Sequence, residues 1–214
     1  MKTQFLVETL TYDQGNLIQE SVVDTEGKNL YLSGCFMQAE TKNRNGRIYP
    51  ITEMQNAVAR LTEQIKQTGG VWGELDHPPS LQVASDRVSH VIQELRVEGN
   101  NVYGKAKILN TPMGQIAKVL ITESGVKPGV SSRGAGEVNE QGIVSGFNLI
   151  TVDIVGTPSC ASAYPTSIYE SLDESVKGRR ILTLAESVQE DQSAQKYLVT
   201  EIKKWLDSSL FVKK

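Results

Sequence analysis

Residues 88–108, VSHVIQELRVEGNNVYGKAKI, decide the fold class, because they predict two strands joined by a tight turn. The runs 88–97 and 102–108 are rich in β-branched and aliphatic residues, and they flank the turn-forming letters EGNN. In the second run, small and aliphatic residues alternate with tyrosine and lysine, which indicates a strand with one face in water. The stretch therefore predicts a β-hairpin that packs its other face on a core.

Similar patterns predict further strands on both sides of this hairpin, with two helices among them. Strand-like runs cover residues 4–10, 29–38, 129–138 and 143–155. Apolar residues three and four apart predict a helix over residues 50–65, and Thr111 with Pro112 begins a second helix. Because regular βαβ alternation is lacking, we expect a mixed α and β fold with a β-barrel core, closed or nearly closed, and surrounding helices.

The chain divides into a folded body and a tail. Residues 1–158 hold the predicted strands and helices, and we expect them to form one domain. Residues 159–193 are rich in serine and acidic residues and predict a polar linker. Residues 194–214 predict an amphipathic helix that docks back on the body or binds a partner, with an apolar face of Ala194, Leu198, Ile202, Trp205 and Leu206.

The composition limits the classes of function. The 214 residues carry a formal net charge of −3, with a pI near 5.5, so neither nucleic acid nor an acidic membrane is expected as a direct ligand. Two cysteines are too few for a disulfide framework and fit a reducing cytoplasm. With no signal peptide or membrane-spanning run recognised, we expect a soluble intracellular protein.

The stretch GELDHPPS at residues 73–80 places His77 before two prolines that restrict the backbone. A histidine is the most economical general base near neutral pH, so His77 is a candidate catalytic residue. An ordinary surface turn is the alternative for this stretch. A metal site is not expected, since Glu74 and Asp76 lack the spaced further ligands that zinc sites use, and no cofactor is expected.

Two later stretches supply a hydroxyl and an acid. Ser131 and Ser132 lie in KPGVSSRGAG, residues 127–136, which suits an exposed nucleophile or else a glycine-rich turn, but lacks the spacing of a phosphate loop. Asp153 lies in a predicted core strand, where a carboxylate needs a partner such as an imidazole, an arginine, a lysine or backbone amides. His77, Ser131 and Asp153 together match the chemical types of a serine hydrolase triad.

Five blocks, in order along the chain, resemble the prohead core proteases of T-even-type bacteriophages. They are FMQAE at 36–40, NRNGRIYP at 43–50, GELDHPP at 73–79, NVYGKA at 101–106 and PGVSSRG at 128–134. The resemblance runs from about residue 36 to 158, and its blocks around His77 and Ser131 are specific. This family is similar in fold to other tailed-phage maturation proteases and to herpesvirus assemblin, a β-barrel surrounded by helices.

The resemblance implies roles for individual residues. It makes His77 the general base and Ser131 the nucleophile, because the first serine of the pair aligns with the family's nucleophile; Ser132 is the competitor. Asp153 is the preferred third member, since His90 precedes the serine whereas the second histidine of the herpesvirus enzymes follows it. Arg133 and Gly134 are the candidates for the oxyanion hole, with a structural ion pair as the alternative for Arg133.

The resemblance also implies a substrate class and a place of action. It implies a serine endopeptidase that cuts scaffold, core and major capsid proteins after glutamate, inside the prohead assembling in the host cytoplasm, and that forms a homo-oligomer. The implied cleavage motif is a triplet that ends in glutamate and has an aliphatic residue two positions earlier. Such triplets end at Glu170, Glu174 and Glu186, so self-cleavage is expected. Another triplet, which ends at Glu94, falls in a predicted strand, so accessibility must select among them. The alternatives are an inactive structural component of the prohead core and a small-molecule esterase, which the missing Gly-x-Ser-x-Gly elbow disfavours.

The loop at residues 43–49 forms a separate feature. Its Arg44 and Arg47 could hold an acidic substrate residue or a neighbouring subunit, because a guanidinium suits carboxylate recognition. A solvated loop with both arginines exposed is the alternative.

Overall fold

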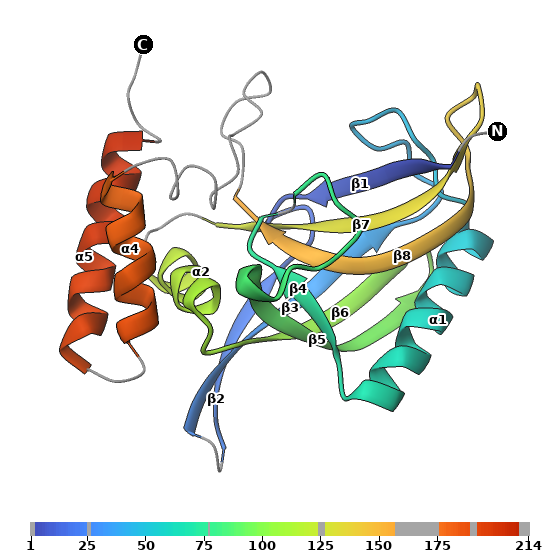
Figure 1. Ribbon diagram of the computed structural model, residues 1–214. Helices are drawn as coiled ribbons and strands as arrows, with labels where there is room; N and C mark the ends of the chain where they lie inside the picture. Colours follow the sequence, from blue (N-terminus) through green and yellow to red (C-terminus); the bar gives the residue numbers. More distant parts are fainter. Residues whose placement is uncertain are drawn as a thin grey trace.

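The structure, a computed structural model, describes residues 3–24, 27–76, 78–123, 127–156, 176–188 and 192–209. Within them, eight strands form two antiparallel sheets (Figure 1). The three-stranded sheet has the order β1 (Gln4–Leu10), β7 (Gly129–Val138), β8 (Val144–Val155). The five-stranded sheet has the order β2 (Ile18–Asp24), β3 (Gly27–Gln38), β6 (Asn101–Ile108), β5 (Val88–Glu98), β4 (Val71–Glu74).

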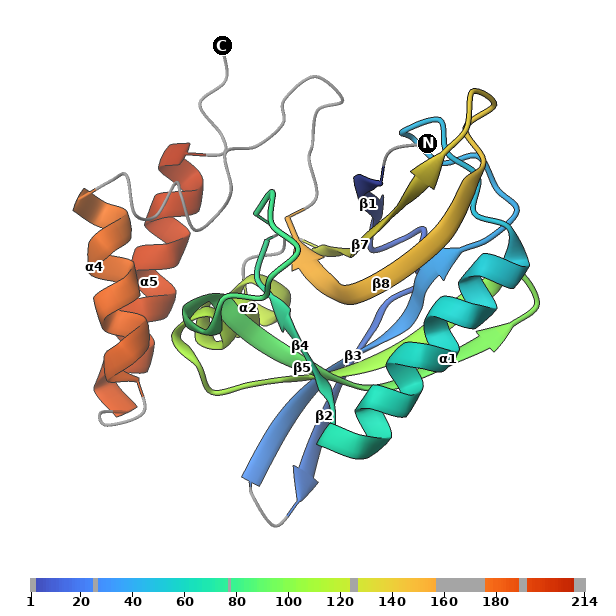
Figure 2. The ribbon, with the colours of Figure 1, turned by 45° about the vertical axis from the view of Figure 1, so that its right-hand side comes forward.

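The predicted hairpin is confirmed as β5 and β6. Glu98 pairs with Asn101 at the turn, and the other edge of β6 pairs with β3, so the hairpin forms the middle of the five-stranded sheet. Every second residue of β6 is buried, as the alternation predicts. Figure 2 shows β2 and the first part of β3 extending beyond the other strands of the molecule.

Two helices complete the body. Helix α1 (Ile51–Thr68) begins after Pro50, ends at Gly69 with a φ of 83°, and packs its apolar face between β5 and β8 (Figure 2). Helix α2 (Pro112–Thr122) begins at Thr111, whose hydroxyl accepts a hydrogen bond from the amide of Gly114, and packs on β5. The short 3₁₀ turn η1 (Ser85–Arg87) leads directly into β5.

The prediction of a β-barrel core is corrected in one respect. The mixed α and β class holds, but within the described residues the two sheets do not close into a barrel; between β4 and β8 they are joined by one parallel bridge, Leu75 to Ile154. The physical reason is that β4 is only four residues long, and the chain then turns at Asp76, which has a φ of 62°. A second isolated bridge joins Ile48 to Ile143.

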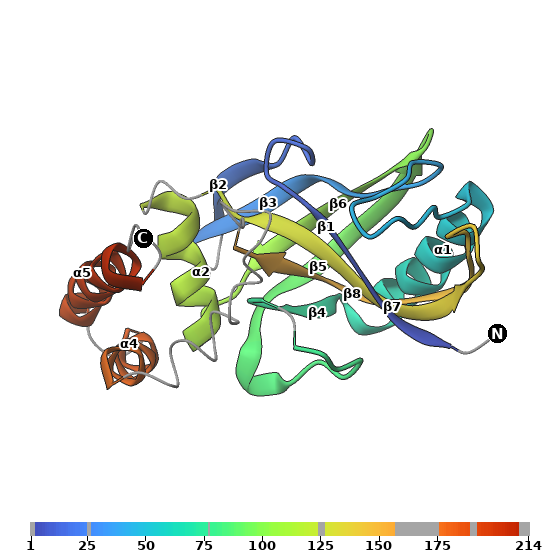
Figure 3. The ribbon, with the colours of Figure 1, turned by 90° about the horizontal axis from the view of Figure 1, so that it is seen from above.

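Two helices follow the body and lie side by side against α2 (Figures 1 and 3). Helix α4 (Val176–Ser187) occupies part of the range in which a polar linker was predicted, and it buries Ile181 and Ala185. Part of the range predicted as a linker thus forms a helix, because apolar residues spaced four apart among charged ones give it a face that packs. Residues 159–175 of the predicted linker lie outside the described residues.

Helix α5 (Gln192–Ser209) carries the apolar face expected of the C-terminal helix. All five of its predicted members are buried, and four of them belong to the same hydrophobic cluster as the sheets: Leu198, Ile202, Trp205 and Leu206. The face thus packs on the protein itself. Of the described helices, none combines the length and the apolar character needed to cross a membrane.

Candidate active site

The central strand β7 places Ser131 opposite one residue of each neighbouring strand. Its register partners are Thr9 of β1 and Asp153 of β8. Directly opposed residues of antiparallel strands project to the same face, so these three side chains leave the sheet on one side. The hydroxyl of Thr9 donates a hydrogen bond of 3.1 Å to that of Ser131, which is buried. The structure therefore brings two of the predicted site residues, Ser131 and Asp153, onto one face.

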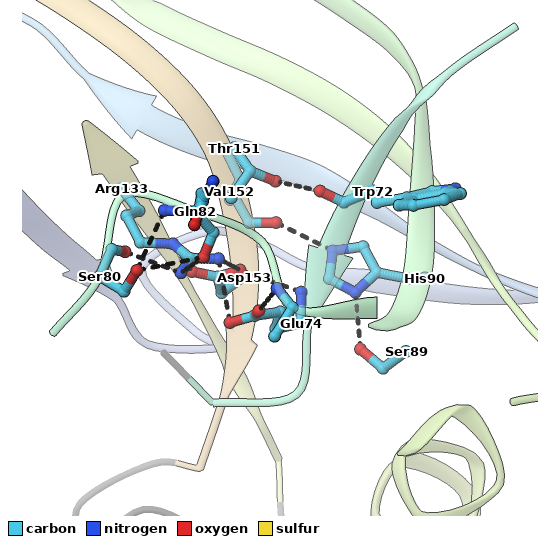
Figure 4. Close-up of polar contacts among 11 residues, drawn as sticks. Trp72, Glu74, Ser80, Gln82, Ser89, His90, Arg133, Thr151, Val152 and Asp153 are labelled. Atoms are coloured by element: carbon cyan, nitrogen blue, oxygen red, sulfur yellow. Dashed lines mark hydrogen bonds and ion pairs between the residues drawn. The ribbon is translucent and has the colours of Figure 1, made fainter. Parts of the chain in front are cut away.

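Asp153 belongs to a buried cluster of three charged side chains (Figure 4). Its carboxylate lies 3.0 Å from Nε and 3.1 Å from Nη2 of Arg133, and Nη2 also lies 3.1 Å from the carboxylate of Glu74. The amide of Glu74 donates a hydrogen bond of 3.0 Å to Oδ1 of Asp153. All three residues are 0% exposed, so the arginine and the backbone amide are the partners that a buried Asp153 needs.

The electrostatic balance of this cluster raises the pKa of Asp153. Two carboxylates share one guanidinium, so the full set of charges would leave one negative charge uncompensated in the interior. Burial, and next the charge of Glu74, outweigh the stabilising effect of Arg133 and raise the pKa of Asp153 to about 7. The carboxyl group of Asp153 therefore gains or loses its proton near neutral pH.

His77 lies outside the described residues, but the chain on both sides of it is held against β7 and β8. Before it, the amide of Asp76 donates a hydrogen bond of 2.7 Å to the carbonyl of Ile154. After it, the carbonyls of Ser80 and Gln82 accept hydrogen bonds from Nη1 of Arg133 at 3.0 and 3.3 Å. These contacts hold residues 78–84, hereafter the 78–84 loop, beside the face of β7 that carries Ser131.

The other histidine, His90, is a buried structural residue. Its Nε2 donates to the carbonyl of Val152 at 2.9 Å and its Nδ1 accepts from the hydroxyl of Ser89 at 2.9 Å (Figure 4). Burial lowers the pKa of His90 to about 4, so the ring is neutral at pH 7. Both ring nitrogens are occupied, and neither contact involves Ser131 or Asp153.

Ser132, the competing serine, projects from the opposite face of β7. It lies in register with Glu8 of β1 and lines a cavity of about 150 Å³ together with Glu8, Tyr49 and residues of the 41–44 segment. Glu8 accepts hydrogen bonds from Tyr49 at 3.1 Å and from Arg47 at 3.2 Å, and burial raises the pKa of its carboxyl group. Arg47 of the 43–49 loop therefore has an intramolecular partner, while Arg44 is exposed at the cavity.

The contacts of Arg133 and Gly134, the two residues predicted for the oxyanion hole, indicate structural roles for the Arg133 side chain and for the missing side chain at Gly134. The Arg133 side chain is committed to the charged cluster. A Cβ atom at Gly134 would lie 2.5 Å from the carbonyl of Asn148, so this glycine permits close packing of β7 on β8. The register of the two strands shifts between Arg133 and Gly134.

Glu74 is the member of this site that the sequence analysis did not assign a role. The signal that could have found it is a second carboxylate beside a strand-like run, which needs a cation as Asp153 does. Within the described ranges, the His, Cys, Asp and Glu side chains form no group of three that could hold a metal ion.

The fold is that of a known class of viral assembly proteases. The chain belongs to the prohead core protein serine protease family, whose sequence model matches residues 7–173. It is 36% identical over 151 residues to the prohead core protein protease of Enterobacteria phage T4, covering 66% of this chain and 71% of that protein. The solved structure of the bacteriophage T4 capsid assembly protease matches with a TM-score of 0.64 and 32% identity, over 74% of this chain and 100% of the other.

Proposed function

We propose that this protein is a serine endopeptidase of the assembling prohead, which cuts scaffold, core and major capsid proteins after glutamate. The family supports proteolysis in capsid assembly. The observation that carries the serine mechanism is the pairing of Ser131 with Asp153 beneath the anchored 78–84 loop. The same kinship supports action inside the prohead. The proposal further includes a location in the host cytoplasm, a homo-oligomeric state, and no direct binding to nucleic acid or membrane. A fold relationship with herpesvirus assemblin remains a prediction.

The proposed triad is His77, Ser131 and Asp153. Oδ1 of Asp153 accepts from the Glu74 amide and from Arg133, whereas Oδ2 contacts Nε of Arg133. A carboxylate has about four acceptor sites, so Oδ2 retains capacity for the N–H of an imidazole. Asp76 bonded to Ile154 supports a position for His77 close to Asp153, which is adjacent to Ile154 in β8.

In the proposed mechanism, His77 takes the proton of the Ser131 hydroxyl as Oγ attacks a peptide carbonyl carbon. Asp153 accepts a hydrogen bond from the other ring nitrogen and fixes the tautomer. The backbone amides of Arg133 and Gly134 bind the oxyanion, since the Arg133 side chain is held in the buried charged cluster. His77 then donates its proton to the leaving amine, and water, deprotonated by the same ring, releases the acyl group from Ser131.

Self-cleavage is part of the proposal, and two of its four candidate sites lie in described helices or strands. Glu170 and Glu174 lie outside the described residues. Glu186 lies in α4, where the preceding Ala185 is buried, and Glu94 lies in β5. Proteases bind extended substrates, so a cut after Glu186 requires α4 to unfold, and we expect the cuts after Glu170 and Glu174 to come first.

The test uses a peptide with the sequence of residues 166–176, TSIYESLDESV, and a matched peptide with E170Q and E174Q. We expect the wild-type chain to cut the first peptide after its glutamates and to leave the second intact. Ser131→Ala should cut neither, and its circular dichroism spectrum should match that of the wild type. Cleavage that persists in Ser131→Ala would refute Ser131 as the nucleophile.

One observation favours the alternative, an inactive structural component of the prohead core. Ser131 is 0% exposed and already hydrogen-bonded to Thr9. If the wild-type chain cuts neither the peptide nor purified prohead core protein, the proteolytic proposal fails and the structural role is favoured.

A further inference from the structure

The Arg133 guanidinium makes polar contacts through all three of its nitrogens. Nη1 donates hydrogen bonds to the carbonyl oxygens of Ser80 and Gln82 at 3.0 and 3.3 Å, and Nη2 donates one to Oδ1 of Asp153 at 3.1 Å. Nε lies 3.0 Å from Oδ2 of Asp153, and Nη2 lies 3.1 Å from a carboxylate oxygen of Glu74, both as ion pairs without hydrogen-bond geometry. The side chain is 0% exposed, so these contacts are all made inside the protein.

The partners of Arg133 come from three different parts of the fold. Asp153 belongs to β8, Glu74 to β4, and Ser80 and Gln82 to the 78–84 loop. Glu74 also accepts a hydrogen bond from the amide of Ala84, so the loop is tied to the cluster at its far end too. In contrast, the loop residues 80–82 are exposed and cannot be held by burial.

We propose that Arg133 is a positioning residue, whose guanidinium fixes the 78–84 loop over β7 so that His77 is presented to Ser131. The inference rests on the proposed function for the catalytic role of His77, and it assigns the side chain of Arg133 a role other than binding the oxyanion. Ser131 and Arg133 are two residues apart in β7, so both side chains leave the same face of the sheet. Arg133, which holds the loop, thus lies next to Ser131 on the same face of β7.

Glu74 sets the charge balance of this cluster. The groups that face Asp153 are the Arg133 guanidinium, the Glu74 carboxylate and the Glu74 amide. With Glu74→Gln, one guanidinium faces one carboxylate and the charges are balanced. The pKa of Asp153 then falls, because the neighbouring charge that raises it has gone. Asp153 is therefore ionised, and able to accept from an imidazole, at lower pH in this variant.

The first test replaces Arg133 with lysine, which keeps the positive charge but has only three donors. We expect kcat for the 166–176 peptide to fall on the order of 100-fold with KM nearly unchanged, because a displaced base affects the chemical step. Amide exchange of residues 80–84, the part of the loop that follows its two prolines, should become faster, while that of β5 and β6 stays the same. The matched control is Arg96→Lys, which alters an exposed arginine paired with Glu98 at 2.6 Å and should change neither quantity.

The second test uses Glu74→Gln and keeps the inference falsifiable if the lysine variant does not fold. We expect this variant to retain cleavage, with the acidic limb of its kcat/KM profile displaced to lower pH by about one unit. A cluster with a merely structural role would leave the limb in place, and that result would overturn the inference.

Amide exchange separates this inference from the proposed function. It is measured on Ser131→Ala and on Ser131→Ala combined with Arg133→Lys, neither of which needs to be active. Faster exchange of residues 80–84 in the double variant supports the positioning role even if Ser131 proves not to be the nucleophile. Unchanged exchange, or unchanged kcat in a folded Arg133→Lys chain, would overturn it even in an active protease.

Discussion

Ser131 and Asp153 face each other across the β7–β8 pair, and the side chain of Arg133 joins the second of them to the 78–84 loop. A hydroxyl and a carboxyl group from neighbouring strands are therefore held on one face by a rigid sheet. Sites built on strands are positioned more accurately than sites on loops. The 78–84 loop is held beside this face by hydrogen bonds from the buried Arg133 to the carbonyls of Ser80 and Gln82.

The two adjacent serines should differ sharply when replaced. Ser131→Ala should lower kcat for the 166–176 peptide by about 10³-fold or more, since it removes the proposed nucleophile. Ser132→Ala should retain most of the activity, because Ser132 projects to the other face of β7, beside Glu8. Steady-state cleavage assays of the two variants check this. The reverse order of effects would make Ser132 the nucleophile and would require the catalytic face to be the one with the cavity.

The sequence predicts the strands with strong local patterns and misses those without. Strand β7 has the predicted bounds, because its run is flanked by Pro128 and the turn at residues 139–142. Strand β2 was not predicted, because Ile18–Asp24 mixes polar and apolar residues without a long apolar run. Barrel closure was wrong because it depends on contacts between strands far apart in the chain, about which a local pattern says nothing.

The site residues, like the strands, could be predicted where local sequence determines them and not where contacts between distant segments do. The requirement that Asp153 have a buried partner was clear from its strand, and the possibility that Arg133 forms a structural ion pair was open. Which of the possible partners Asp153 contacts depends on the register of β7 and β8. That register is set by bulges on both strands. The carbonyl partners of Arg133, at Ser80 and Gln82, could not be predicted, because they reach the cluster only through the turn after β4.

The two glycines of β7 beyond the site should respond differently to alanine. At Gly134 a Cβ would lie 2.5 Å from the backbone carbonyl of Asn148, and a strand backbone cannot easily move away. We expect Gly134→Ala to lower the free energy of unfolding by about 2–3 kcal/mol. At Gly136 the nearest atom, at 2.9 Å, is the end of the Leu6 side chain, which can rotate. Gly136→Ala should cost less than about 1 kcal/mol, and equal values by urea denaturation would contradict the argument.

The α4–α5 pair should contribute to stability through its apolar face. Ile202 is 0% exposed, so Ile202→Ala should lower the free energy of unfolding by about 2–4 kcal/mol. Tyr197, on the same helix and 62% exposed, is the control, and Tyr197→Ala should change it by less than about 0.5 kcal/mol. Urea denaturation followed by Trp205 fluorescence measures both. If Ile202→Ala has no larger effect than the control, the pair does not pack on the body in solution.

His90 should make the protein less stable in acid, in a defined pH window. Its pKa is lowered by burial from 6.5 to about 4 in the native state. As pH falls from 6.5 to about 4, the unfolded chain binds a proton that the native chain does not, so the native state loses stability through this window. The gap corresponds to roughly 3 kcal/mol once the pH is below both values. Asp153 acts in the opposite sense, because its raised pKa favours the native state at low pH and this contribution is lost as pH rises through about 7.

A difference measurement isolates the contribution of His90 from that of Asp153. In His90→Gln, the amide can still donate to the carbonyl of Val152, but the side chain no longer titrates. Loss of the ring contacts adds a cost that does not depend on pH, so any change of the difference with pH reports the titration of His90. The free energy of unfolding of the wild type minus that of the variant should therefore shrink by roughly 3 kcal/mol between pH 7.5 and pH 4. Urea denaturation at half-unit steps of pH gives this difference, and a value independent of pH would mean that native His90 takes up its proton as readily as the unfolded chain does.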